Sequence, residues 1–213
     1  MGAGGEVTRL RSRMSRTFAT KEGLLRTEVS TLPVNYLSGK SWLPIDDSLV
    51  TNTVGALINR ADDFSVVLPA LAGTPAISGQ GGLSVTSLLT GAALVAPKVD
   101  GQTATYAGVF PGVDEVFQVR PRVLEQTLRL ASAAVPTSYP QQVTLSVGYR
   151  LGDALADGSL PILDSSGTQV AALPAPVLFD SSTDPDTNTS TVNARYQVSG
   201  VAPTYAVTTV VDR

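Results

Sequence analysis

Residues 106–130 read YAGVFPGVDEVFQVRPRVLEQTLRL, and this stretch decides the fold because two strand-like segments lie on either side of a turn at its centre. In DEVFQVR, Phe117 and Val119 fall on one face of a strand. In VLEQTLRL, the leucines at 124, 128 and 130 alternate with polar residues at 125, 127 and 129. A period of two is typical of a half-buried β-strand. The stretch therefore predicts antiparallel strands joined by short turns.

A helix is the alternative for the second half of this stretch. A helix that begins at Pro121 would also place Leu124, Leu128 and Ala131 on one face. We favour the strand, and the helix stays open at this point.

The corner ahead of DEVFQVR has the residue types of a type II turn at Pro111-Gly112. Proline presets φ at the second turn position, and glycine supplies the positive φ of the third. The Asp114 carboxylate can accept hydrogen bonds from nearby backbone N–H groups. We therefore interpret Pro111, Gly112 and Asp114 as a structural corner, not as a catalytic site.

Other segments show the same strand signals. FSVVLP (64–69), LSVTSLL (83–89) and QQVTLSVGYRL (141–151) are short β-rich runs, and ILDSSGTQVAALP (162–174) has a turn at its centre. We expect about ten to twelve short strands without a βαβ unit, which is typical of an all-β antiparallel β-sandwich, with a jelly roll as one topology.

The expected organisation has three parts. Residues 1–15 are Gly- and Arg-rich and predict a flexible basic tail. Residues 16–182 form the predicted β-sandwich domain. Residues 183–213 contain a polar loop and terminal strands that we expect to continue into a following domain, since the last alternation looks unfinished.

Charge limits the partners. The net charge is −3, and only 15% of residues are charged, below the roughly 25% of typical soluble domains. Nucleic-acid binding needs a basic surface, so we expect no nucleic-acid partner. Basic residues gather once, at Arg9, Arg11, Arg13 and Arg16. This cluster is either solvated or an arm that docks on anions.

The chain has no histidine and no cysteine, which removes a Ser-His-Asp triad and the usual zinc and thiolate sites. Carboxylates are the remaining catalytic groups, at Asp46-Asp47, Asp62-Asp63 and Asp114-Glu115. Neighbours in a strand point to opposite faces, so such pairs seldom act together. Two acids from different strands could still form a glycosidase pair about 5–10 Å apart. We expect no catalytic residue and no cofactor.

Two candidate ligand sites rest on incomplete sequence patterns. Asp184, Asp186 and Asn188 have the alternate spacing of a calcium loop, but the glycine and glutamate of the helix–loop–helix motif are replaced by Thr189 and Arg195. Trp42 and Tyr36 are candidates for stacking on a sugar ring, although a lone tryptophan in a β-domain is more often part of the core.

Three blocks together resemble a family. They are EGLLRTEVSTLPVNYLSGKSWLPIDDSLV with NRADDFSVVLP, the block ATYAGVFPGVDEVFQVRPRVLEQTLRL, and GTQVAALPAPVLFDSS. They resemble the N-terminal β-region of large secreted actinobacterial proteins of the RHS/YD-repeat, wall-associated or polymorphic-toxin-like kind, which often carry DNRLRE-type modules. Tyr106, the run from Phe110 to Asp114, and the acidic Glu125 match the family pattern, whereas its usual lysine before the glutamate is missing.

The resemblance covers roughly residues 16–182 and implies a non-catalytic structural or interaction module of a larger exported polypeptide, secreted or on the cell surface. It implies no catalytic residue. The partners it implies are the rest of the polypeptide, cell-wall glycan or another protein. A carbohydrate-binding module and a carboxylate-dependent glycoside-active enzyme are the alternatives. No apolar run approaches the roughly 20 residues of a membrane span, and the first residues lack the apolar segment of a secretory signal.

Overall fold

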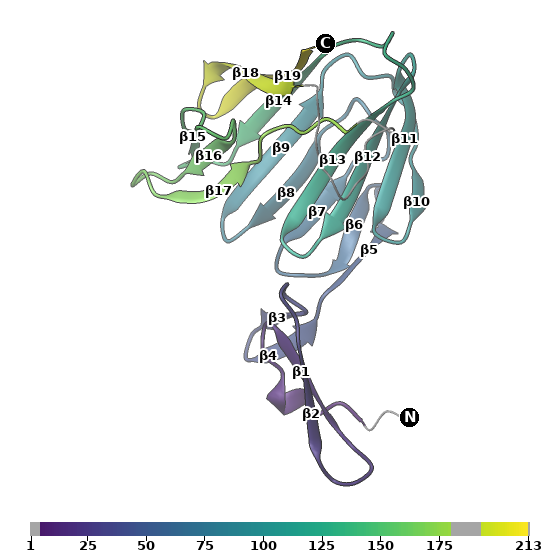
Figure 1. Cartoon of the computed structure of the whole chain (residues 1–213), viewed down its shortest axis with the longest axis vertical. Coiled ribbons are helices and arrows are strands. Elements are labelled where there is room, and N and C mark those ends of the chain that lie inside the picture. The colour runs from purple at the N-terminus through teal and green to yellow at the C-terminus, as the bar shows by residue number, and fades with distance from the viewer. Residues whose placement is uncertain (1–4, 180–192, 213) are drawn as a thin grey trace.

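The computed structural model describes residues 5–179 and 193–212, and nearly all of the regular structure in them is antiparallel β-strand. The all-β prediction is confirmed. The strands form a β-sandwich, and a smaller N-terminal module, residues 5–45, projects from one end of it (Figure 1).

The largest layer is an eight-stranded antiparallel sheet. In spatial order its strands are β18 (Asn193–Val201), β19 (Thr204–Asp212), β14 (Ser138–Leu145), β9 (Leu83–Leu89), β8 (Ala76–Gln80), β7 (Ser65–Leu68), β6 (Leu57–Ala61) and β5 (Asp46–Thr51). Strands β5 to β9 follow one another as a meander. Among the strands that the structure describes, this order contains no Greek key, so the topology is not that of a jelly roll.

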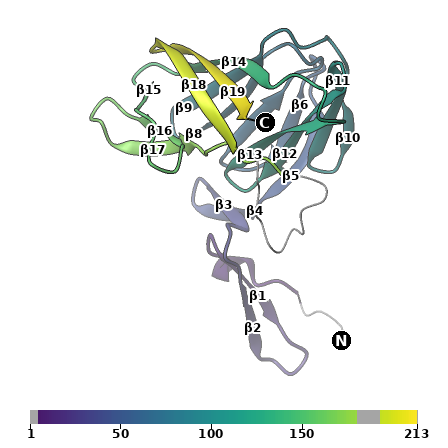
Figure 2. The same cartoon turned by 45° about the horizontal axis from the view of Figure 1, so that its top comes forward.

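Two smaller sheets complete the sandwich. The four-stranded sheet is a meander of β10 (Lys98–Asp100), β11 (Thr103–Phe110), β12 (Val113–Arg120) and β13 (Val123–Leu130). The three-stranded sheet contains β15 (Arg150–Leu151), β16 (Leu160–Leu163) and β17 (Gln169–Leu173). Figure 2 shows them over different parts of the large sheet.

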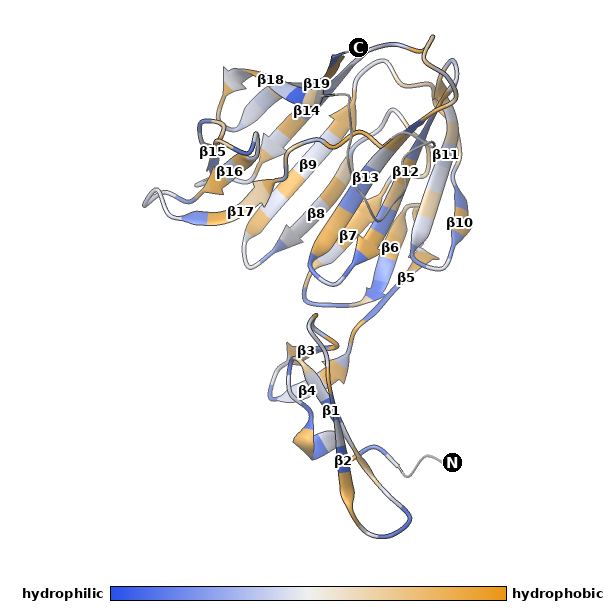
Figure 3. Cartoon of the chain, in the orientation of Figure 1, coloured by the Kyte–Doolittle hydropathy of each residue, from blue (hydrophilic) through white to orange (hydrophobic). Residues whose placement is uncertain are grey.

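Both smaller sheets cover the same face of the large sheet. On β14, Tyr139 belongs to the core under the four-stranded sheet, while Val143 and Leu145 belong to the core under the three-stranded sheet. These residues are two, four or six positions apart, so their side chains point to one face. The alternation of hydrophobic and hydrophilic residues along the strands is visible in Figure 3.

Tyr106 lies at the centre of the larger core. It is fully buried, and its ring meets Phe117 edge-on at a centroid distance of 6.0 Å. Its hydroxyl donates a hydrogen bond of 2.6 Å to the Pro69 carbonyl, just beyond β7. A buried phenol needs such a partner, and this one ties the four-stranded sheet to the large one.

The opposite face of the large sheet carries one row of β-branched residues across all eight strands. The register pairs them directly from edge to edge in the order Val201, Thr204, Thr144, Thr86, Ile77, Val67, Ile58 and Val50. Direct cross-strand pairs of β-branched residues favour the sheet. The row helps to hold the eight strands in one register.

The structure decides between strand and helix for residues 123–130 in favour of the strand. Along β13, residues 124, 126, 128 and 130 are half-buried, and the residues between them are exposed. Packing of Leu124, Leu128 and Leu130 against the larger core explains why the period of two prevails.

The structure corrects the expected domain boundaries at both ends. Strands β18 and β19 belong to the large sheet, and β19 pairs with β14 on one side and with β18 on the other. The last strand is therefore not short of partners. Residues 5–15 are not a free tail, because the Val7 N–H donates to the Thr17 carbonyl and Asn35 donates to the carbonyls of Ser12 and Ser15.

The N-terminal module consists of two hairpins and a single 3-10 turn. The turn is η1 (Thr8–Leu10), and the hairpins are β1 (Ser15–Ala19) with β2 (Leu25–Val29) and β3 (Asn35–Ser38) with β4 (Ser41–Pro44). The fully buried residues of this module are Thr17 and Asn35, both polar. Hydrogen bonds, not an apolar core, hold it together.

We predict that Tyr106→Phe lowers the free energy of unfolding by about 1–3 kcal/mol, because the variant leaves the Pro69 carbonyl without its hydrogen bond. Chemical denaturation would measure the change. Tyr36→Phe is the matched control, since Tyr36 is only half-buried and lies outside both cores. Equal stability of the two variants would contradict this role of Tyr106.

Candidate functional site

The corner at residues 111–114 forms as a structural feature. Pro111 and Gly112 connect β11 to β12, and Gly112 has a φ of 72°. Asp114 Oδ1 accepts a hydrogen bond of 2.8 Å from the Gly108 N–H, across the bulge of β11. This is the contact that the sequence leads us to expect of Asp114. A side chain added at Gly112 would stand 2.9 Å from Val135, so the close packing also requires glycine.

Glu115, next to this corner, points into the sandwich. It alternates with Val113 and Phe117 on the core face of β12 and is 4% exposed. The Gln126 side chain donates a 2.6 Å hydrogen bond to Glu115, and Gln141 on β14 donates one of 3.1 Å to Gln126. These three residues form a polar chain that crosses from one sheet to the other.

Burial raises the pKa of Glu115, and the hydrogen bond from Gln126 offsets only part of this effect. The charge of Glu115 in turn adds to the effect of burial on Tyr106, whose pKa is also raised. Sequence reasoning named Glu115 only as a member of the Asp114-Glu115 pair of acids and missed this chain. The signal was present, since Glu115 stands two residues before Phe117 and so shares its face.

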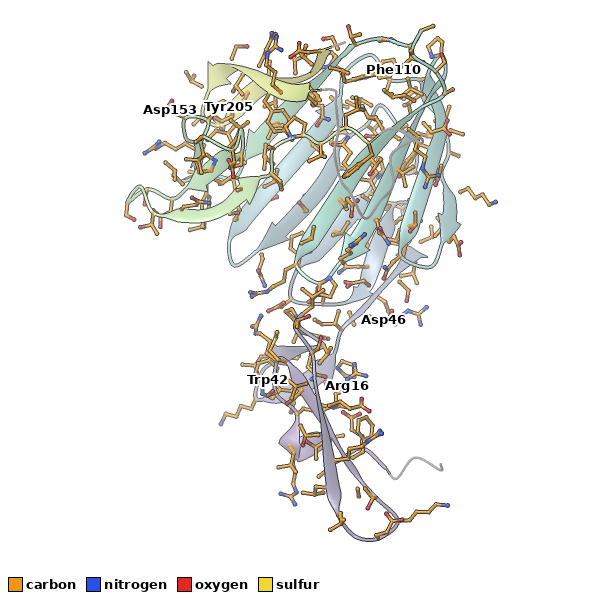
Figure 4. All side chains as sticks on the ribbon, viewed as in Figure 1. Arg16, Trp42, Asp46, Phe110, Asp153 and Tyr205 are labelled. Carbon is orange, nitrogen blue, oxygen red and sulfur yellow. The ribbon has the colours of Figure 1, made fainter. Side chains whose placement is uncertain are left out.

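The acids at 46–47 and 62–63 lie near one another, since Asp47 and Asp62 interact. Figure 4 labels Asp46 near the end of the sandwich that adjoins the N-terminal module. Ser48 donates hydrogen bonds to Asp46 through its N–H and its hydroxyl, and these lower the pKa of Asp46. Asp47 is buried, which raises its pKa. Burial, reinforced by the charge of Asp47, raises the pKa of Asp62 to about 6.

An open groove of about 670 Å³ lies beside these acids. Asp46, Asp47 and Asp100 line it, together with Arg16 from the module, whereas Asp62 does not. Asp46 is further engaged by Arg60, whose Nε lies 3.5 Å from its second oxygen. The groove thus offers three acids, of which Asp47 is buried, Asp46 is already bound on both oxygens and Asp100 is exposed.

Asp63 joins the parts of the molecule. Its Oδ2 lies 3.4 Å from the Arg13 guanidinium of the module and 3.8 Å from that of Arg122 in the β12–β13 turn. All three side chains are partly exposed, so each pair contributes no more than about 1 kcal/mol. Asp63 therefore has a structural role at the joint.

Trp42 and Tyr36 do not form a shared stacking platform. In the β3–β4 hairpin, Trp42 pairs with Leu37 and Tyr36 pairs with Leu43. Adjacent pairs point to opposite faces of the ribbon, so the two aromatic rings lie on different sides. Trp42 is half-buried and belongs to neither core, with the Arg13 guanidinium 5.8 Å from its ring centroid.

Trp42 lines a second groove, of about 610 Å³, in the N-terminal module. The other residues around it are Thr8, Arg9, Arg11, Lys40, Ser41 and Leu43. The structure thus brings together two features that the sequence kept separate, the arginine cluster and the tryptophan.

The calcium candidates Asp184, Asp186 and Asn188 lie outside the described residues. Within the described ranges, no group of three or more acidic side chains is arranged to hold a metal ion. The helical content of the same ranges is the 3-10 turn η1, far too short to cross a membrane.

No family model, no curated protein and no solved structure matches the chain. The resemblance to the N-terminal region of RHS/YD-repeat proteins therefore stays a prediction from the quoted blocks.

We predict that Glu115→Gln changes the pH dependence of stability. A raised pKa in the folded state means that the carboxylate form opposes folding. The wild-type chain should then lose stability as the pH rises above the ordinary glutamate pKa of about 4.5. The variant should lose less stability over this range, as thermal melting at pH 4 to 8 would show. The loss that remains comes from Asp47 and Asp62, whose pKa values are also raised. Glu125→Gln, on the exposed side of β13, is the control. Parallel curves for wild type and Glu115→Gln would contradict the prediction.

Proposed function

We propose that the chain is a non-catalytic structural or interaction β-domain of a large secreted or cell-surface bacterial protein of the RHS/YD-repeat type. In this proposal the sandwich is the rigid part, and the N-terminal module is the part that contacts a partner. The partner is another segment of the same long polypeptide.

The observation that carries the proposal is the apolar surface of the N-terminal module. Its described residues include no buried large hydrophobic side chain. Seven are exposed, namely Leu10, Leu24, Leu25, Val29, Leu32, Leu37 and Leu43. An isolated two-stranded hairpin is at best marginally stable in water, and exposed apolar patches mark interaction sites. A partner that covers these residues would supply the missing burial.

The β1–β2 hairpin fits this role best. Leu25 pairs with Ala19, and Val29 pairs with Ser15, so Leu25 and Val29 lie on one face of the hairpin. All five residues of β2 are exposed. The outer edge of β2 has no strand beside it among the described residues, so its backbone is open to a further strand.

Hydrogen exchange tests the proposal. We expect the amides of residues 24–32 to exchange roughly tenfold more slowly in the protein from the full reading frame than in the 213-residue chain. The reason is that a partner covering β2 would protect these amides from solvent. Leu25→Lys with Val29→Lys should remove this protection. Lys substitutions at Val54 and Leu94, exposed on the sandwich, are the control. Equal exchange in the two chains would contradict the proposal.

The glycoside-active alternative rests on Asp46 and Asp47. Their pKa values are shifted in opposite directions, as in an acid and base pair. However, Asp46 has both oxygens engaged by Ser48 and Arg60. The two residues are also adjacent in β5, which does not suit attack from two sides of a sugar bond.

We predict that neither the wild-type chain nor Asp47→Asn releases reducing ends from a panel of cell-wall and plant glycans. Asp47→Asn should instead raise the melting temperature at pH 7, because it removes a buried carboxylate. Asp157→Asn, in an exposed turn, is the control. Hydrolysis by the wild type that is lost in Asp47→Asn would favour the enzyme.

A further inference from the structure

The groove between η1 and β4 is a separate candidate site. It has a volume of about 610 Å³, and its cations are Arg9, Arg11 and Lys40. It lies in the most basic part of the chain. Residues 1–45 contain seven Lys and Arg against three Glu, a net charge of +4. Residues 46–213 contain eight against fifteen, a net charge of −7.

The hydrogen bonds of Arg11 hold together the segments that line the groove. Its guanidinium makes two hydrogen bonds of 2.7 Å to Glu6 and donates a third, of 3.1 Å, to the Trp42 carbonyl. The fork-shaped pair with Glu6 is geometrically well defined. This pair neutralises Arg11, and the hydrogen bond to the Trp42 carbonyl fixes the segment around η1 against β4. Arg11 is therefore a positioning residue, and its charge is already matched.

Arg9 and Lys40 are the cations left for a ligand. Both are exposed, and neither makes a hydrogen bond or ion pair with any residue that the structure describes. They come from η1 and from the β3–β4 turn, and both line the groove. Two unmatched cations facing one cavity favour an anionic ligand.

Trp42 and two hydroxyl groups supply the other contacts. The half-buried indole offers an apolar face and an N–H donor, as ligand sites with aromatic linings do. Ser41 and Thr8 add hydroxyls at the rim. A sugar ring matches this set, because its C–H groups can stack on the indole and its hydroxyls can bind Ser41 and Thr8.

We propose that this groove binds an acidic saccharide, a sugar unit that carries a carboxylate or phosphate group. The acidic group lies between Arg9 and Lys40, and the ring contacts Trp42. The proposal goes beyond the proposed function, which depends on the apolar face of the β1–β2 hairpin and not on this groove.

Charge distribution favours a saccharide over a nucleic acid. Single-stranded nucleic acid carries one charge on each nucleotide and needs a continuous basic path with several aromatic platforms. Here there are two free cations and one tryptophan, and the adjoining sandwich carries −7. A ligand with one or two local charges fits better.

Trp42 also provides the test, because it is the only tryptophan in the chain and its fluorescence reports on this groove alone. The probes are tetragalacturonate and glucose 6-phosphate, with maltotetraose as the neutral control. We expect a saturable change with at least one acidic probe and none with maltotetraose. Arg9→Gln with Lys40→Gln should weaken binding roughly tenfold or more.

The matched control is Lys21→Gln with Lys98→Gln, which removes two exposed lysines outside the groove and should leave binding unchanged. Trp42→Leu, measured by calorimetry, should lose binding. Four results would overturn the proposal. They are no response to either acidic probe, an equal loss in the control variant, equally tight binding of inorganic phosphate alone, and tighter binding of a dT8 oligonucleotide. None of these results tests the proposed contact between β2 and a partner, which hydrogen exchange measures separately.

Discussion

The hydrogen bond from Tyr106 to the Pro69 carbonyl fixes how the two main layers of the sandwich face each other. A hydroxyl that is fully buried costs free energy unless it is paired, and the Pro69 carbonyl lies in the other layer. The position of Tyr106 then sets the edge-on contact with Phe117 and, through the strand pairing, the register of β11 with β12. The Pro111-Gly112 corner must close that pairing within two residues. The packing of the core, the register of β11 with β12 and the length of the Pro111-Gly112 corner thus all depend on this one hydrogen bond.

Polar links repeat this principle elsewhere between the layers. The chain from Glu115 through Gln126 to Gln141 also runs from the four-stranded sheet to the large one. Apolar side chains alone can slide or repack with little penalty, whereas a buried hydrogen bond is satisfied in one register only. The carboxyl group of Glu115 is the least favourable member, because burial opposes its charge. The sandwich therefore gives up some stability for a defined arrangement of its two layers.

Local alternation explains what could be predicted from the sequence. It was sufficient for the strands that carry Phe117, Val119 and the leucines of β13, whereas the contact of Asp114 with the Gly108 N–H was expected from the chemistry of a carboxylate beside a turn. It failed where non-local contacts decide. Asn35 binds the carbonyls of Ser12 and Ser15 more than 19 residues away, so the Arg-rich start folds although it has no apolar pattern. Sequence spacing likewise could not place Trp42 beside Arg9, since η1 and β4 are brought together by contacts between distant residues, such as the hydrogen bond from Arg11 to the Trp42 carbonyl.

The two parts of the molecule are stabilised in different ways, and this difference bears on function. The sandwich has closed apolar cores, so its surface can change without loss of the fold. The module has buried polar residues and exposed apolar ones, and partly exposed ion pairs such as Asp63 with Arg13 contribute to its joint with the sandwich. Such pairs are weak. A partner that binds the module would therefore have the larger stabilising effect, because burial of its exposed apolar side chains adds stability that the module does not have alone. The basic groove also lies in the module, so a ligand bound there would likewise add stability to the module.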